Sequence, residues 1–132
     1  MIRLVLVDDQ PSVRQGLRMR LTVEPDMTVI GEASNGLSAM TLVQQVALDI
    51  VVMDVEVPEM DGIAAAPAMR DSTPQSAVVM LSIHDYASTR ARAHAEGAAA
   101  FVNKSGAIEV LLATIRQVAE HRKTETGTRL FA

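Results

Sequence analysis

Cysteine is absent from this 132-residue sequence, and both aromatic residues and lysines are scarce. Without cysteine the chain has no disulfide, no cysteine-based metal site and no thiol nucleophile. The only aromatic residues are Tyr86, Phe101 and Phe131, so the core must be aliphatic, and stacking of nucleic-acid bases is disfavoured. Lysine occurs only as Lys104 and Lys123, against ten arginines. The net charge of -4 has the wrong sign for a basic DNA-binding surface.

Long hydrophobic runs are also missing. No segment reaches the ~18 apolar residues of a membrane span. The apolar segment Ile2–Val7 is too short for a signal-peptide core and runs directly into Asp8 and Asp9. Hydrophobic residues make up 48% of the chain and charged residues 21%, which is typical of one globular domain. We therefore expect a single cytoplasmic domain that does not contact a membrane.

Five short apolar runs alternate with longer amphipathic stretches. Several of the runs lack polar alternation, as in IVVM at 50–53, which indicates strands buried on both faces of a parallel sheet. The predicted strands are Ile2–Val7, Met27–Ala33, Asp49–Asp54, Ala77–Ser82 and Ala98–Val102.

The stretches between these runs have helical spacing. The clearest stripe runs from about Gly106 to His121, and Gly97 is a plausible C-terminal cap for the helix before it. The short stretch at 62–70 contains Pro67, which predicts a kinked helix. The first predicted helix begins near Pro11, and the second follows Asn35-Gly36. The other three cover about 62–70, 86–96 and 106–121.

Strict alternation of five strands and five helices predicts a doubly wound α/β domain with a five-stranded parallel sheet. Right-handed crossovers then place helices on both faces of the sheet. We expect this domain to occupy residues 1–122. Residues 123–132 are polar and are predicted to be a tail or the start of a linker.

Polar residues follow the predicted strands where ligands bind an open parallel sheet, at the carboxyl ends. Asp8 and Asp9 follow the first strand, Asp54 ends the third, Ser82 ends the fourth, and Lys104 lies just past the fifth. Clustered carboxylates repel one another unless a cation neutralises them, and Mg²⁺ prefers such oxygen ligands. A lysine and a hydroxyl can bind phosphate oxygens, and a carboxylate can be a nucleophile. The set predicts Mg²⁺-dependent phosphoryl transfer to an aspartate.

Each of these residues also has an ordinary structural interpretation. Asp9 is close enough to Pro11 to be a helix cap, and Asp54 precedes a loop in which it would serve as a turn residue. Ser82 could cap the next helix, and Lys104 could be a solvated surface lysine. These interpretations do not explain why all four residues fall at the same edge of the sheet.

The sequence resembles the receiver domain of bacterial two-component response regulators, over about residues 2–121. Within this family it is most similar to the subfamily whose output is a LuxR-type helix-turn-helix. The matching segments are LVLVDDQPSVRQGL at 4–17, DIVVMDVEVPEMDG at 49–62, VVMLSIHD at 78–85 and EGAAAFVNKS at 96–105.

The resemblance implies a flavodoxin-like fold with strand order 2-1-3-4-5. It implies that Asp54 is the phosphoacceptor and that Asp8 and Asp9 hold Mg²⁺, with Asp8 acting through water. The backbone carbonyl of Glu56 is a further implied metal ligand. Lys104 is implied to contact the phosphoryl group.

The resemblance also implies a switch. Ser82 would move to bind the phosphoryl group, and Phe101 would turn inward with it, changing the surface of the fourth helix, fifth strand and fifth helix. Two residues depart from the usual pattern of the family. Ile83 stands where a small residue is common, and Ser105 stands where a proline is common. Glu56 and His84 are expected to tune the lifetime of the phosphorylated state.

The expected protein is therefore a self-phosphorylating switch, not a conventional enzyme, that takes its phosphoryl group from a sensor histidine kinase. A DNA-binding output domain in a longer protein, stand-alone action and a phosphorylation-promoted homodimer all stay open. A phosphate-independent interaction module is disfavoured, because Asp9, Asp54, Ser82 and Lys104 are all intact. A haloacid-dehalogenase-like phosphatase is also disfavoured. That family has a second acid two residues after the nucleophilic aspartate, followed by a threonine. Glu56 fits the position of the second acid only loosely, and no threonine follows at the required place.

Overall fold

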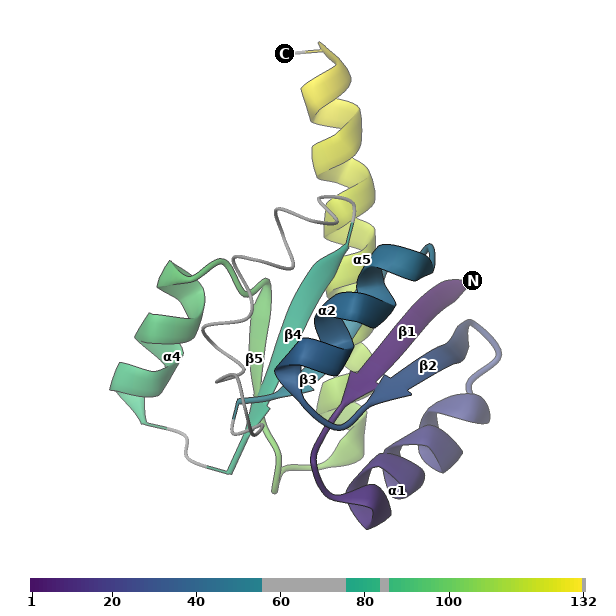
Figure 1. The fold of residues 1–132 in the computed structure, drawn as a ribbon. Helices are drawn as coiled ribbons and strands as arrows, with labels where there is room; N and C mark the ends of the chain where they lie inside the picture. The colour runs from purple at the N-terminus through teal and green to yellow at the C-terminus, as the bar shows by residue number, and fades with distance from the viewer. Residues whose placement is uncertain (56–75, 84–85, 132) are drawn as a thin grey trace.

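A computed structural model describes residues 1–55, 76–83 and 86–131. Five parallel strands form one sheet in the order β2-β1-β3-β4-β5, which confirms the predicted topology (Figure 1). The order reverses direction between β1 and β3, so the carboxyl ends of these strands flank the crevice in which doubly wound sheets bind ligands. The strands are β1 Ile2–Val7, β2 Met27–Ala33, β3 Ile50–Asp54, β4 Ala77–Ser82 and β5 Ala100–Asn103.

The described residues contain four helices, and they cover both faces of the sheet. Buried residues of α1 and α5 pack on one face, whereas those of α2 and α4 pack on the other (Figure 1). The helix predicted at 62–70 lies outside the described residues. The helices are α1 Pro11–Thr22, α2 Gly36–Gln45, α4 Ala87–Ala95 and α5 Ile108–Phe131.

The sheet is the centre of an aliphatic core. Every residue of β3 is buried, as the apolar run IVVM at 50–53 predicts for a strand covered on both faces, and the burial extends to Asp54. Alternate residues divide between the two core layers: Val51 and Met53 face α2 and α4, whereas Ile50 and Val52 face α1 and α5. Burying one such side chain stabilises the fold by about 1.5–3 kcal/mol.

The fifth strand begins two residues later than predicted, at Ala100 instead of Ala98, because the preceding residues complete a helix cap. Gly97 has a φ of 96°, the left-handed conformation that glycine adopts without strain. The Gly97 N–H donates to the carbonyl of His94, and the Ala98 N–H donates to that of Ala93. This pair of hydrogen bonds is a Schellman motif, which confirms Gly97 in the capping role.

The last helix, α5, is longer than its apolar stripe predicts. It begins at Ile108 and continues past His121 to Phe131, so the backbone of residues 123–131 is helical (Figure 1). Its buried stripe consists of Leu111, Leu112, Ile115 and Val118. Among the described residues, no helix combines the length and the hydropathy needed to cross a membrane.

The second strand contains a one-residue irregularity in its pairing with β1. Leu4 pairs with Val29, but the next residue, Val5, pairs with Gly31. Ile30 is therefore an extra residue, as in a β-bulge. A Cβ atom on Gly31 would lie 2.9 Å from the Leu42 side chain of α2, so the glycine also allows close approach of that helix.

Because of the bulge, the side chains at the end of β2 lie on the opposite face of the sheet from the one that regular alternation would give them. Val29 packs in the core layer of α1 and α5, whereas Ala33 packs in the layer of α2 and α4. In a regular strand these two residues, four apart, would face the same side. After the bulge Glu32 faces α1, where it forms ion pairs with Arg14 and Arg18.

An ion-pair cluster joins α5 to the turn between α1 and β2. Arg116 Nε lies 2.9 Å from Asp26 Oδ2, and Arg116 Nη2 lies 2.7 Å from Glu24 Oε1. Arg20 also pairs with Glu24 at 3.0 Å. The hydrogen bonds from Arg116 lower the pKa of Glu24 and the pKa of Asp26, with a further hydrogen bond from Arg20 acting on Glu24.

We predict that Arg116→Gln lowers the urea midpoint of unfolding at pH 7, and that the difference from the wild type shrinks in acid. Both acids have a pKa below that of the unfolded chain, so the stabilisation is present above their ordinary values of 4.5 and 3.8. It is lost as the pH falls through the lowered values. Because the groups are exposed, the effect is modest. An equal difference at pH 7 and pH 3 would contradict this prediction.

Candidate functional site

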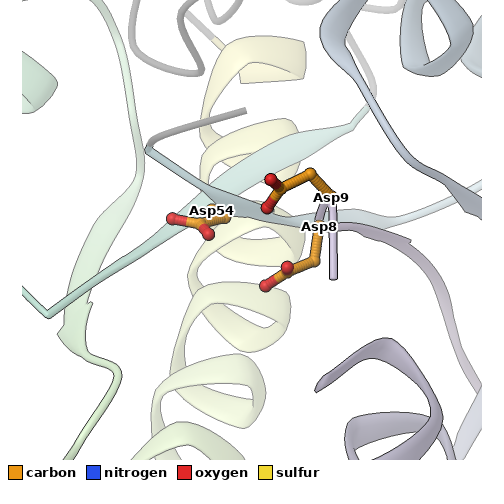
Figure 2. A group of neighbouring side chains, drawn as sticks. All are labelled: Asp8, Asp9 and Asp54. Carbon is orange, nitrogen blue, oxygen red and sulfur yellow. The ribbon is translucent and has the colours of Figure 1, made fainter. Parts of the chain in front are cut away.

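Three carboxylates meet at the carboxyl edge of the sheet. Asp8 and Asp9 directly follow β1, and Asp54 is the last residue of the neighbouring β3. One carboxylate oxygen from each lies within 4.8 Å of the others, and Figure 2 shows the side chains gathered at one place. Asp8 and Asp54 are buried, with 2% and 8% exposure, whereas Asp9 is exposed. The predicted acidic cluster is therefore present.

Lys104 joins two of these carboxylates. Its Nζ lies 2.6 Å from Asp8 Oδ2 and 2.8 Å from Asp54 Oδ2. Burial by itself lowers the pKa of Lys104, but the hydrogen bonds that it donates to Asp54 and Asp8, together with their negative charges, outweigh burial, so that the pKa is raised. The main-chain N–H of Lys104 also donates to the carbonyl of Ser82 at 2.9 Å, which fixes the start of the loop after β5. Lys104 is not the solvated surface lysine of the alternative interpretation.

Asp8 and Asp9 differ in how their carboxylates are used. Asp8 Oδ1 accepts a hydrogen bond from the main-chain N–H of Gln10 at 2.9 Å, and its other oxygen accepts from Lys104. Within the described part of the chain, the Asp9 carboxylate makes no hydrogen bond or ion pair. The N-cap of α1 is Gln10, without a side-chain cap, so Asp9 does not serve as the helix cap. Asp9 thus presents an open pair of oxygens.

Ser82 and Phe101 lie beside this cluster in the sheet. Ser82 is the last residue of β4 and is 1% exposed, and the residue before it, Leu81, pairs with Asp54. Phe101 lies in β5, is partly buried, and packs against the core layer of α2 and α4. The Arg90 guanidinium carbon of α4 lies 4.7 Å from the centroid of the Phe101 ring, in cation–π contact.

Two predicted residues lie outside the described part of the chain, namely Glu56 and His84. A contact that the sequence did not predict involves Arg14 of α1, whose Nη1 donates to the main-chain carbonyl of Asp8 at 2.5 Å. The only signal for Arg14 was its position in the first half of a helix that follows the paired acids. That signal does not say which way a long side chain turns.

The site can hold a hard divalent cation. Its donors are all carboxylate oxygens, and Mg²⁺ prefers oxygen ligands. Three carboxylates and one lysine also leave two uncompensated negative charges, which one divalent ion would neutralise. A doubly wound sheet with strand order 2-1-3-4-5, with three acids and a lysine at its switch point, defines the class of flavodoxin-like domains.

Comparison with known proteins gives the family. The response regulator receiver domain family model matches residues 4–116, and the chain belongs to this family. Receiver domains bind Mg²⁺ in an acidic pocket and are generally not enzymes. The cluster of Asp8, Asp9 and Asp54 has the donors for such a pocket.

The relatives include proteins whose names describe different roles. The chain is 36% identical over 134 residues to the uncharacterized transcriptional regulatory protein YxjL of Bacillus subtilis strain 168, covering 99% of this chain and 62% of that protein. It is 39% identical over 106 residues to a protein-glutamate methylesterase/protein-glutamine glutaminase of Methanospirillum hungatei, covering 79% of this chain and 30% of that protein. The chain thus spans less than two thirds of these relatives.

Solved structures agree with the subfamily resemblance. A two-component response regulator of the LuxR family from Aurantimonas has a TM-score of 0.87 and 31% identity, covering 91% of this chain and 86% of that one. This similarity to a LuxR-family response regulator is what the resemblance predicts.

Proposed function

We propose that this domain is a phosphorylation-dependent switch that accepts a phosphoryl group on Asp54. The observation that carries the proposal is the position of Lys104, 2.8 Å from Asp54 and 2.6 Å from Asp8 in a buried acidic cluster. An ammonium group at hydrogen-bond distance from the nucleophile is placed to bind an oxygen of an incoming phosphoryl group. Membership in the receiver family supports the same role.

Asp8, Asp9 and Asp54 would hold Mg²⁺, together with the backbone carbonyl of Glu56. Asp9 is proposed as a direct ligand, because its oxygens are open among the described residues. Asp8 is proposed to act through water, because both of its oxygens already accept hydrogen bonds. When bound, the ion would neutralise charge on the phosphoryl oxygens and on the carboxylates.

The proposed transfer forms one bond and breaks one. An Asp54 carboxylate oxygen attacks phosphorus, and the phosphorus–nitrogen bond of a kinase phosphohistidine breaks, so that the imidazole leaves with the electron pair. Lys104 binds the phosphoryl oxygens as the group moves between the two proteins. Hydrolysis of the acyl phosphate by water later returns the Asp54 carboxylate and inorganic phosphate.

The switch is proposed to follow from added charge. Phosphorylation brings about one further negative charge and new acceptor oxygens to a buried place. The Ser82 hydroxyl is proposed to donate to this group, and Phe101 to turn inward as the loop after β4 moves. The affected surface would be α4, β5 and α5. Only one residue of α4, Ala93, is buried, so this helix has little packing to oppose a shift.

The output and the surroundings are further proposals. A sensor histidine kinase is the proposed phosphoryl donor, and transcription is the proposed output, by analogy with the transcriptional regulatory protein of Bacillus subtilis. A DNA-binding output domain would then belong to the full-length protein, with residues 1–122 as the receiver and the helical segment after it as the start of a linker. The proposed location is the cytoplasm.

Intact-mass measurement tests the proposal. The chain is incubated with Mg²⁺ and acetyl phosphate, and the expected result is the gain of one phosphoryl group that hydroxylamine removes. Omitting Mg²⁺ is the control and should abolish the gain. No gain with any small phosphodonor or kinase would instead favour a phosphate-independent interaction module.

A further inference from the structure

The support beneath the acidic cluster comes from α1. Arg14 Nη1 donates to the main-chain carbonyl of Asp8 at 2.5 Å, and this carbonyl belongs to the peptide that joins Asp8 to Asp9. Because a peptide unit is planar, a hydrogen bond that fixes this carbonyl also fixes the direction in which the chain enters Asp9. Arg14 is therefore in contact with the one backbone unit that both carboxylates share.

Arg14 is itself held in place. Its Nε atom is buried, makes no hydrogen bond among the described residues, and lies 3.4 Å from Glu32 Oε1, within ion-pair range. Glu32 faces α1 because of the bulge in β2, and it also pairs with Arg18. Only 18% of the Arg14 side chain is exposed, compared with 53% for Arg18. The arginine therefore links β2 to the Asp8–Asp9 peptide through a largely buried side chain.

We infer that Arg14 is a positioning residue for the cation site, held by Glu32, and that it orients the Asp8 and Asp9 carboxylates toward Asp54. The inference rests on the proposed function, since it concerns the affinity of the proposed Mg²⁺ site. Residues that orient metal ligands typically contribute 10–100-fold to metal affinity.

The sign of the effect separates positioning from simple electrostatics. A guanidinium near a cation site repels the cation, so removal of its charge alone would tighten Mg²⁺ binding. Loss of a positioning hydrogen bond would weaken it. Because Glu32 already offsets the charge of Arg14, we expect the positioning effect to prevail.

The test is calorimetric titration of the whole chain with Mg²⁺. Arg14→Gln should raise the Mg²⁺ dissociation constant by about tenfold. Arg18→Gln is the matched control, because Arg18 pairs with the same glutamate but has no hydrogen bond to Asp8, and its dissociation constant should stay within about twofold of the wild type. Glu32→Gln should give a smaller increase than Arg14→Gln. Arg14→Met, which keeps the apolar stem of the side chain but loses its charge and its hydrogen bond, provides the test if Arg14→Gln does not fold.

A second readout separates positioning from loss of stability. In Arg14→Gln the Mg²⁺ concentration for half-maximal labelling by acetyl phosphate should rise, while the labelling rate at saturating Mg²⁺ returns close to that of the wild type. A variant that is merely destabilised would lose rate without a change in the Mg²⁺ midpoint. An unchanged or tighter dissociation constant in Arg14→Gln, or in Arg14→Met if the glutamine variant does not fold, would overturn the inference and leave the proposed function standing. Absence of Mg²⁺ binding by the wild type would instead overturn the metal site and the inference with it.

Discussion

Replacement of Asp54 by asparagine is expected to abolish phosphoryl incorporation from acetyl phosphate while the domain stays folded. The asparagine amide has nearly the same volume as the carboxylate but lacks the negative oxygen that attacks phosphorus. Loss of a nucleophile lowers the rate of a covalent step by orders of magnitude, so labelling should fall to background. The measurement is intact mass after incubation with Mg²⁺, together with the urea midpoint as a check on folding.

Asp49 provides a matched control for this substitution. It precedes the same strand at the opposite end of the sheet, and its Oδ2 accepts the main-chain N–H of Arg3 at 2.8 Å. Asparagine can accept the same hydrogen bond through its side-chain oxygen, so Asp49→Asn should fold and be labelled at the wild-type rate. Labelling of Asp54→Asn at an undiminished rate would remove Asp54 from the assigned role.

Replacement of Lys104 by methionine is expected to have two opposite effects. Its ammonium group lies within 2.8 Å of carboxylate oxygens on both Asp8 and Asp54, so lysine and a divalent cation compete for the same negative charge. Without the lysine, Mg²⁺ should bind more tightly, by about tenfold or more for an interaction of over 1.4 kcal/mol in a partly buried site. Labelling of Asp54 should nevertheless fall, because the phosphoryl oxygens lose a charged donor.

Calorimetry and intact-mass labelling measure the two effects of this substitution separately. Lys123→Met is the control, because Lys123 is the only other lysine and follows the proposed domain boundary. It should change neither the Mg²⁺ affinity nor the labelling rate. Weaker Mg²⁺ binding in Lys104→Met would show that the lysine supports the cation site and does not compete with the cation.

The sequence predicts the acidic cluster well because the physical rule behind it is simple. The carboxyl ends of parallel strands lie at one edge of the sheet, so residues at or just after the ends of β1, β3 and β5 lie at that edge whatever their separation along the chain. Asp8, Asp54 and Lys104 come together for this reason. The unbroken apolar run of β3 before Asp54 likewise predicts a strand buried on both faces, as observed.

Features that depend on the direction of a side chain could not be predicted in this way. The hydrogen bond from Arg14 to Asp8 requires a long side chain to turn back toward the start of its own helix. The later start of β5 depends on hydrogen bonds that consume the N–H groups of Gly97 and Ala98. The extension of α5 past His121 could not be predicted, because the sequence of residues 122–131 carries no apolar stripe at helical spacing. The predicted helix at 62–70 and the roles of Glu56 and His84 remain predictions.

The bulge in β2 makes strand register as important as residue identity for the contact between β2 and α1. Side chains of a strand alternate with a period of two, so one extra residue reverses the parity of everything that follows it. If the seven residues of β2 instead paired regularly with β1, Glu32 would lie opposite Val7 and would face α2 instead of α1. The glutamate would still be present in the sequence, and Arg14 would have lost it. A change of register in an edge strand could thus act at the acidic cluster without altering any residue that touches it.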